Sequence, residues 1–136
     1  MIYECFFQSY NKKEADVHGI VYTPQSIVDF MCASVVEVLQ TEFGKSLGDD
    51  DVVILDPATG TGNFIVNLTK HPIPACDLEA TYRDRLFTNE IILLPYYIAS
   101  INIEHAYYEK TGQYELFEGL CFFDTLDIAE GAQHDP

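Results

Sequence analysis

The chain has 136 residues, 48% of them hydrophobic, which suits a single folded domain and excludes a disordered tail. With 7 Lys+Arg against 22 Asp+Glu, its formal net charge is -15. This is the opposite of the basic surface that phosphate neutralisation requires, so we expect the chain by itself to repel nucleic acid.

The sequence gives no sign of a membrane, a disulfide framework or a metal centre. No apolar run approaches the roughly 20 residues of a membrane span, and the first residues lack the layout of a signal peptide. The 4 cysteines stand far apart, without a C-x-x-C pair or a histidine at zinc-ligand spacing. We therefore expect a cytoplasmic protein without membrane contact and without a bound metal.

The N-terminal segment, residues 1–48, is predicted to be helical. Aromatic residues at helical spacing favour a short amphipathic helix from residue 2 to about residue 10. A longer helix is expected over residues 24–43, with Thr23 as its N-cap and Pro24 at its first position. Gly44 ends the apolar pattern and therefore the helix.

The rest of the chain, residues 49–136, alternates between predicted strands and helices. Residues 52–55 form an unbroken apolar run typical of a strand covered on both faces, which favours a parallel sheet. A glycine-rich turn over residues 56–62 follows, then a helix over residues 63–70 that Pro72 and Pro74 prevent from continuing. We expect these two segments together, 1–48 and 49–136, to form one domain.

A second strand over residues 86–89 precedes a helix from Pro95 to a stop at Gly112, and a third strand is expected within residues 116–123. The alternation of strands and helices predicts an α/β fold. Its architecture would be the first half of a doubly wound sheet, preceded by a helical segment.

In such a sheet, ligands bind outside the carboxyl ends of the strands. Gly60 and Gly62, directly after the first strand, let the backbone turn sharply and approach a ligand, and the next helix offers unpaired N–H groups to an anion. Glu90 ends the second strand, where an acid can accept hydrogen bonds from ribose hydroxyls. Asp124 follows the third strand and could accept a bond from a purine amine. The pattern therefore indicates an adenosine-containing ligand.

Two departures from known nucleotide motifs narrow this ligand. A dinucleotide fingerprint would require glycine where the chain has Ile65, and a phosphate-binding P-loop is absent from the sequence. NAD and ATP are therefore disfavoured.

These segments resemble the adenine-specific DNA methyltransferases that use S-adenosylmethionine, in particular the type ISP and type IIG restriction-modification enzymes. Residues 19–31 look like that family's motif X, residues 56–64 like motif I, residues 89–99 like motif II and residues 117–126 like motif III. The order of the four motifs carries the resemblance. It implies a Rossmann-like, S-adenosylmethionine-dependent methyltransferase fold.

By this resemblance, a single set of residues would contact the cofactor: Tyr22, Thr23, Pro24, Asp56, Pro57, Ala58, Thr59, Gly60, Gly62, Phe64, Glu90 and Asp124. The family's catalytic Asn-Pro-Pro-Tyr type loop is absent from this sequence, so no catalytic residue is assigned. The chain is expected to be a truncated cofactor-binding half, inactive alone and reaching DNA only through parts that it lacks.

Two other hypotheses are compatible with the sequence. The chain could be a non-catalytic acidic interaction or regulatory module in which the charge of -15 is the functional feature. It could also be the cofactor-binding half of a methyltransferase for RNA or protein. Taken singly, Thr23 and Pro24 are explained by a helix start, Glu90 by a solvated acid at a strand end and Asp124 by a turn.

Overall fold

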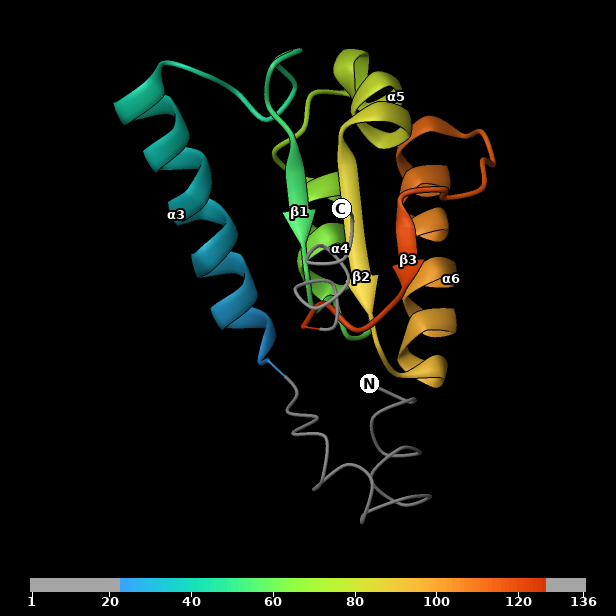
Figure 1. Cartoon of the computed structure of the whole chain (residues 1–136). Coiled ribbons are helices and arrows are strands. Elements are labelled where there is room, and N and C mark those ends of the chain that lie inside the picture. The colour runs from blue at the N-terminus through green and yellow to red at the C-terminus, as the bar shows by residue number, and fades with distance from the viewer. Residues whose placement is uncertain (1–22, 127–136) are drawn as a thin grey trace, which may run out of the picture.

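The structure is a computed structural model that describes residues 23–126. Within this range a three-stranded sheet, ordered β1-β2-β3, is combined with four helices (Figure 1). In chain order the elements are α3 (Gln25–Phe43), β1 (Ile54–Asp56), α4 (Asn63–Lys70), α5 (Ala75–Asp84), β2 (Leu86–Glu90), α6 (Leu93–Thr111) and β3 (Leu120–Phe122). The predicted helix over residues 2–10 lies outside the described residues.

Helix α3 confirms the long predicted helix but corrects how it begins. Pro24 is the N-cap residue and no side chain caps the helix, so the prediction that Thr23 is the N-cap was wrong. With ψ of 141°, Pro24 is still extended, and its carbonyl accepts the N–H groups of Ile27 and Val28. Gly44 ends the helix as predicted, with a left-handed φ of 66°.

All three strands are parallel, as the unbroken apolar run indicated. Ile54 pairs with Leu86 in the register of β1 and β2, and Thr88 pairs with Leu120 in that of β2 and β3. The first and third strands are shorter than predicted, and β1 is shifted toward the loop that follows it. Helix α6 also begins two residues before the predicted start at Pro95.

The core lies on one side of the sheet, where Figure 1 shows α4 and α6 behind the strands. Ile65 of α4 and Ile103 of α6 are fully buried against Leu86 of β2. On the opposite face of the sheet, 64% of Leu55 and 39% of Phe87 remain exposed. The prediction that the first strand is covered on both faces was therefore wrong for the described residues. Among the described residues, the sheet is therefore covered on one face only.

Helix α5 was not predicted. It begins directly after Pro74 and buries only Leu78, Thr81 and Tyr82, so its apolar signal is sparse. One of its tertiary contacts is aromatic: the Tyr82 ring stacks on Tyr107 of α6, with centroids 4.1 Å apart. Long-range stacking therefore stabilises a helix whose own sequence pattern is weak.

Candidate functional site

The glycine-rich loop joins β1 to α4 at the carboxyl end of the sheet, where the sequence placed it. Gly60 and Gly62 both have left-handed backbones, with φ of 58° and 84°. A Cβ atom on Gly62 would lie 3.3 Å from the Ile103 Cγ1 and 3.4 Å from the Ala99 Cα, so a larger residue would be strained by the left-handed backbone and would crowd α6. No atom lies within 4 Å of the corresponding position on Gly60. The chain therefore leaves open space above Gly60.

The structure brings Glu90 to this loop. Its carboxylate accepts a hydrogen bond from the Gly60 N–H at 2.8 Å through Oε2, and one from the Ile92 N–H at 2.8 Å through Oε1. Glu90 is only 7% exposed, so it is not the solvated acid of the alternative explanation. Because each carboxylate oxygen can accept more than one hydrogen bond, bracing the loop leaves Glu90 able to accept bonds from a ligand.

The segment after β3 reaches the same edge of the sheet. The Asn89 side chain donates to the Phe123 carbonyl at 2.7 Å and to the Thr125 hydroxyl at 2.6 Å. That hydroxyl donates in turn to the Pro57 carbonyl at 2.8 Å. Asp124 lies in this segment, but its carboxylate accepts the Leu126 N–H at 2.9 Å, as expected of a turn-forming residue.

Sequence reasoning did not single out three polar residues that hold this site together: Asn89, Thr125 and Asn102. The Asn102 side chain, on α6, donates to the Thr61 carbonyl at 2.9 Å and so fixes the loop from the side of the core. The available signal was an asparagine among apolar residues in the middle of the predicted helix. For Asn89 and Thr125 the signal was only their position beside the strand ends.

Several buried polar atoms at this edge have no hydrogen-bond partner among the described residues. They include the Asp56 Oδ2, the Thr59 hydroxyl oxygen and the Asn89 Oδ1. Buried polar atoms are rarely left unpaired in proteins, so these three fit a site that a polar ligand completes. Burial also raises the pKa of the Asp56 carboxyl, a rise that the hydrogen bond from the Ala58 N–H and the nearby Thr59 side chain oppose.

The beginning of α3 lies at the same end of the sheet as the carboxyl ends of the strands (Figure 1). The Asn67 side chain of α4 donates to the Asp29 carboxylate of α3 at 2.6 Å, which fastens the two helices together. Thr23 and Pro24 therefore share an end of the molecule with the loop, whereas Tyr22 lies outside the described residues. Phe64, at the start of α4, is half-buried and packs on the core.

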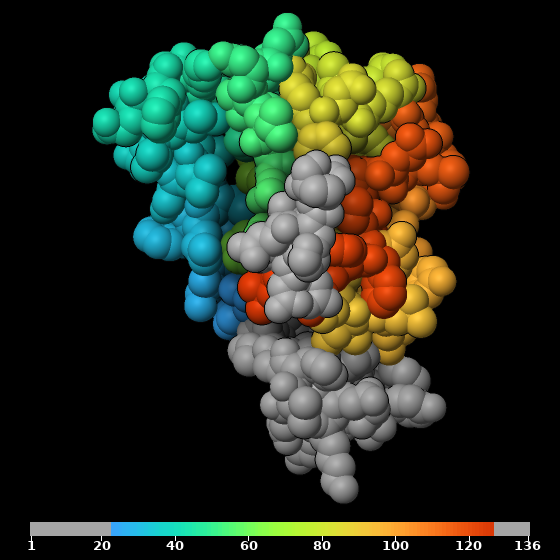
Figure 2. All heavy atoms as spheres, viewed as in Figure 1, coloured from blue at the N-terminus to red at the C-terminus, as the bar shows by residue number. Residues whose placement is uncertain are grey.

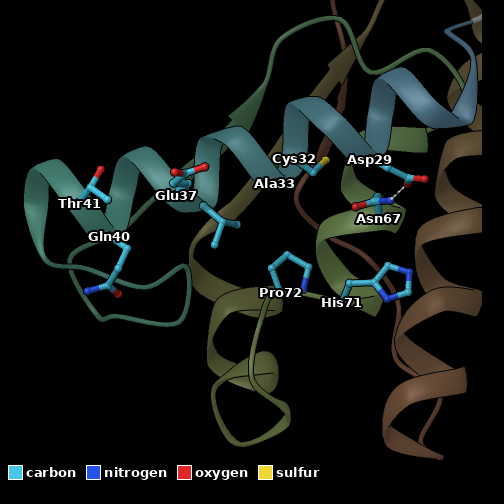
Figure 3. A pocket seen from close by; sticks show the side chains of 10 residues that line it. Asp29, Cys32, Ala33, Glu37, Gln40, Thr41, Asn67, His71 and Pro72 are labelled. Carbon is cyan, nitrogen blue, oxygen red and sulfur yellow. Dashed lines mark hydrogen bonds between the residues drawn. The ribbon is translucent and has the colours of Figure 1, made fainter.

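A separate pocket of about 690 Å³ lies between α3 and α4 (Figure 3). Its labelled side chains include Cys32, Glu37 and His71, and none of the predicted cofactor-binding residues lines it. Burial, reinforced by the negative charges of Asp29 and Asp56, raises the pKa of the Cys32 thiol. A protonated thiol is a poor nucleophile and a poor metal ligand, so this pocket shows no reactive group of that kind.

Residues 23–126 contain neither a metal-binding cluster nor a membrane-spanning helix. No group of three or more His, Cys, Asp or Glu side chains there is placed to hold a metal ion. No helix in that range is long and apolar enough to cross a membrane.

The chain is similar to known proteins. The sequence matches the N-6 DNA Methylase family over residues 1–111. No curated protein matches the chain. Among solved structures, similar backbones occur in the cryo-EM structure of a DrdV–DNA complex, in the ATP-dependent type ISP restriction-modification enzyme LlaBIII bound to DNA, and in a nuclease-deletion mutant of the type ISP enzyme LlaGI with a DNA substrate mimic.

The similarity is close but covers a small part of those proteins. The identities to DrdV, LlaBIII and LlaGI are 48%, 44% and 40%, with TM-scores of 0.84, 0.77 and 0.78. The matches cover 90%, 82% and 93% of this chain but only 12%, 8% and 11% of those chains. Since the family match extends over most of the sequence, this chain belongs to the N-6 DNA methylase family.

Proposed function

We propose that the chain binds S-adenosylmethionine and forms the cofactor-binding part of a DNA methyltransferase that modifies the exocyclic amine of adenine in a restriction-modification system. The observation that carries the proposal is the contact between Glu90 and Gly60, 2.8 Å long, which joins the acid at the end of β2 to the glycine loop after β1. The space above Gly60 is open, and unpaired polar atoms of Asp56 and Thr59 lie in the same loop.

The polar groups of the site fit the parts of this cofactor. Glu90 would accept hydrogen bonds from the ribose hydroxyls, as acids at this strand end do in nucleotide-binding α/β folds. The first N–H groups of α4, which no side chain caps, would bind the carboxylate of the methionine part. The carboxylates of Asp56 and Glu90 would attract the positively charged ammonium and sulfonium groups.

When bound, S-adenosylmethionine supplies a methyl group on a positively charged sulfur, which an amine can displace directly. The contribution of this chain would be to hold that group in one orientation, because positioning removes much of the entropic barrier to transfer. The chain has no Asn-Pro-Pro-aromatic tetrapeptide to hold a flipped adenine. We therefore propose that it does not transfer methyl groups by itself.

Isothermal titration calorimetry with S-adenosylmethionine tests the binding. The wild-type chain should give a saturable heat, and Gly60→Val should weaken binding at least tenfold because its side chain fills the open space. Gly112→Val is the matched control: Gly112 has a left-handed φ of 72° and no atom within 4 Å of its Cβ position, but it caps the far end of α6.

A second pair of variants separates ligand contact from folding. Glu90→Gln keeps an acceptor for one loop N–H but removes the charge, and it should weaken binding more than Glu118→Gln, an exposed acid before β3. No heat from a folded wild-type chain at millimolar ligand would contradict the proposal and favour the acidic interaction module. Methyl transfer to duplex DNA by the chain alone would contradict its assigned inactivity.

A further inference from the structure

The segment after β3 is held at the carboxyl edge of the sheet by side chains. Phe123 still donates its N–H to the Glu90 carbonyl at 3.2 Å, but within residues 23–126 no hydrogen bond between backbone groups ties residues 124–126 to the rest of the chain. Figure 1 shows the chain crossing from β3 toward the loop after β1, and Figure 2 shows atoms of this last stretch, in red, at the surface near the start of α3. What fixes this exposed segment is therefore a small set of polar side chains.

Asn89 holds the segment through hydrogen bonds whose direction is fixed. The Phe123 carbonyl can only accept, so the nitrogen of the Asn89 amide must face it, at 2.7 Å. The same nitrogen donates to the Thr125 hydroxyl at 2.6 Å, and the single proton of that hydroxyl goes to the Pro57 carbonyl at 2.8 Å. One side chain of β2 thereby joins the loops that follow β3 and β1. We call Asn89, Thr125 and the Pro57 carbonyl the clasp.

The clasp holds the residues on both sides of Asp124. Phe123 precedes Asp124 and Thr125 follows it, and both accept hydrogen bonds from the same amide nitrogen. The Asp124 side chain is half-buried, and its Oδ1 accepts the Leu126 N–H at 2.9 Å. Since a carboxylate has about four acceptor positions, others remain for a donor on a ligand. The clasp therefore determines where those acceptor positions lie relative to the glycine-rich loop.

The Asn89 amide also has an unused acceptor. Its Oδ1 is buried and has no hydrogen-bond partner among the described residues, although its nitrogen makes two bonds. A buried amide that served stability alone would normally pair both of its ends. The backbone carbonyl of Asn89 accepts the Thr59 N–H at 2.9 Å, so this residue also holds the glycine-rich loop. Asn89 thus links two loops of the candidate site while one of its acceptors stays available.

We propose that Asn89 and Thr125 are positioning residues: the clasp holds Asp124 where its carboxylate accepts the amine of a purine, and so makes the site selective for adenine. This inference rests on the proposed function, in which Glu90 binds the ribose at the adjacent strand end. A fixed carboxylate favours a base that carries an amine and repels a base that presents a carbonyl oxygen at the same place. Because the segment is ordered before the ligand arrives, binding does not have to order it.

Isothermal titration calorimetry of the full 136-residue chain with two ligands tests the proposal. S-adenosylhomocysteine, the demethylated form of the cofactor, carries the amine of adenine, and S-inosylhomocysteine has a carbonyl oxygen in its place. The wild-type chain should bind the first ligand about tenfold more tightly or better, because the second leaves a carboxylate facing an oxygen. Thr125→Val keeps the shape of the side chain but has no hydroxyl, and it should reduce this preference to about twofold or less.

Three further variants separate positioning from folding. Thr125→Ser keeps the hydroxyl and should retain the preference, whereas Asn89→Leu removes both donated bonds and should lose it. Thr41→Val, at an exposed threonine near the far end of α3, is the matched control and should leave both affinities unchanged. Since Thr125 is exposed, Thr125→Val should keep the wild-type circular dichroism spectrum. A merely structural role would weaken both ligands to the same extent and would leave the preference as it was.

The possible outcomes distinguish this inference from the proposed function. If the wild-type chain binds S-adenosylhomocysteine but Thr125→Val keeps the wild-type preference, the positioning role is overturned and the proposed function stands. Equal binding of the two ligands by the wild-type chain would also overturn it, because Asp124 would then not contact the amine. If the folded wild-type chain binds neither ligand, both proposals fail.

Discussion

Replacing each glycine of the loop by alanine separates backbone strain from packing. Both Gly60 and Gly62 have a positive φ, so an L residue at either position costs about 1–2 kcal/mol. The same replacement lowers the conformational entropy of the unfolded chain, which stabilises the folded state by about 0.4–1 kcal/mol and offsets part of the strain. Gly60→Ala should therefore lower the free energy of unfolding by only about 1 kcal/mol, since no atom lies near its new methyl group.

Gly62→Ala should cost more, because its Cβ would lie 3.3 Å from the Ile103 Cγ1 and 3.4 Å from the Ala99 Cα. The Ile103 side chain must give way by a few tenths of an ångström, whereas the distance to the Ala99 Cα is that of an ordinary van der Waals contact. Overpacking adds about 1–3 kcal/mol, and a contact this mild lies at the low end of that range. We expect a total loss of about 2 kcal/mol for Gly62→Ala, compared with about 1 kcal/mol for Gly60→Ala.

Urea unfolding followed by circular dichroism measures the difference between the two variants. If the slope of the unfolding free energy against urea concentration is the same in both variants, a shift of the urea midpoint reports a change in stability and not a change in the unfolded state. Equal losses at the two positions would refute the argument, because strain alone would then explain both. A larger loss for Gly60→Ala would mean that the open space above Gly60 is filled in solution.

Two further predictions concern charged groups. Burial raises the pKa of Asp56, so the folded state holds the proton more tightly, and this contribution to stability is lost as the pH rises from about 4 through the raised pKa. Asp56→Asn should accordingly increase the unfolding free energy at pH 7 and flatten its pH dependence; urea titrations at several pH values that show an unchanged dependence would contradict this. The Arg85 side chain is buried and donates to Asp50, Gly48 and Thr81, at 2.7, 3.1 and 3.0 Å. Arg85→Ala should cost about 2–4 kcal/mol in thermal unfolding, whereas Asp50→Ala, at a fully exposed carboxylate, should change little, and similar losses for the two would contradict a buried role for Arg85.

The sequence alone predicted the elements whose signals are local. Gly44 and Gly112 mark the ends of α3 and α6 because left-handed caps favour glycine, and the helix over residues 63–70 was placed at its observed bounds. The loop at residues 56–62 and Glu90 were identified because each directly follows an apolar strand. The family resemblance was confirmed by the match over residues 1–111.

Only the tertiary structure decided what these residues contact. Gly60 and Glu90 are 30 positions apart, and no sequence pattern states that the acid accepts the loop N–H. Helix α5 is supported by the stacking of Tyr82 on Tyr107, a contact between distant segments. The exposure of Leu55 and Phe87 could likewise not be read from the apolar run around β1, because apolar composition favours burial but does not show whether a face of the sheet is covered.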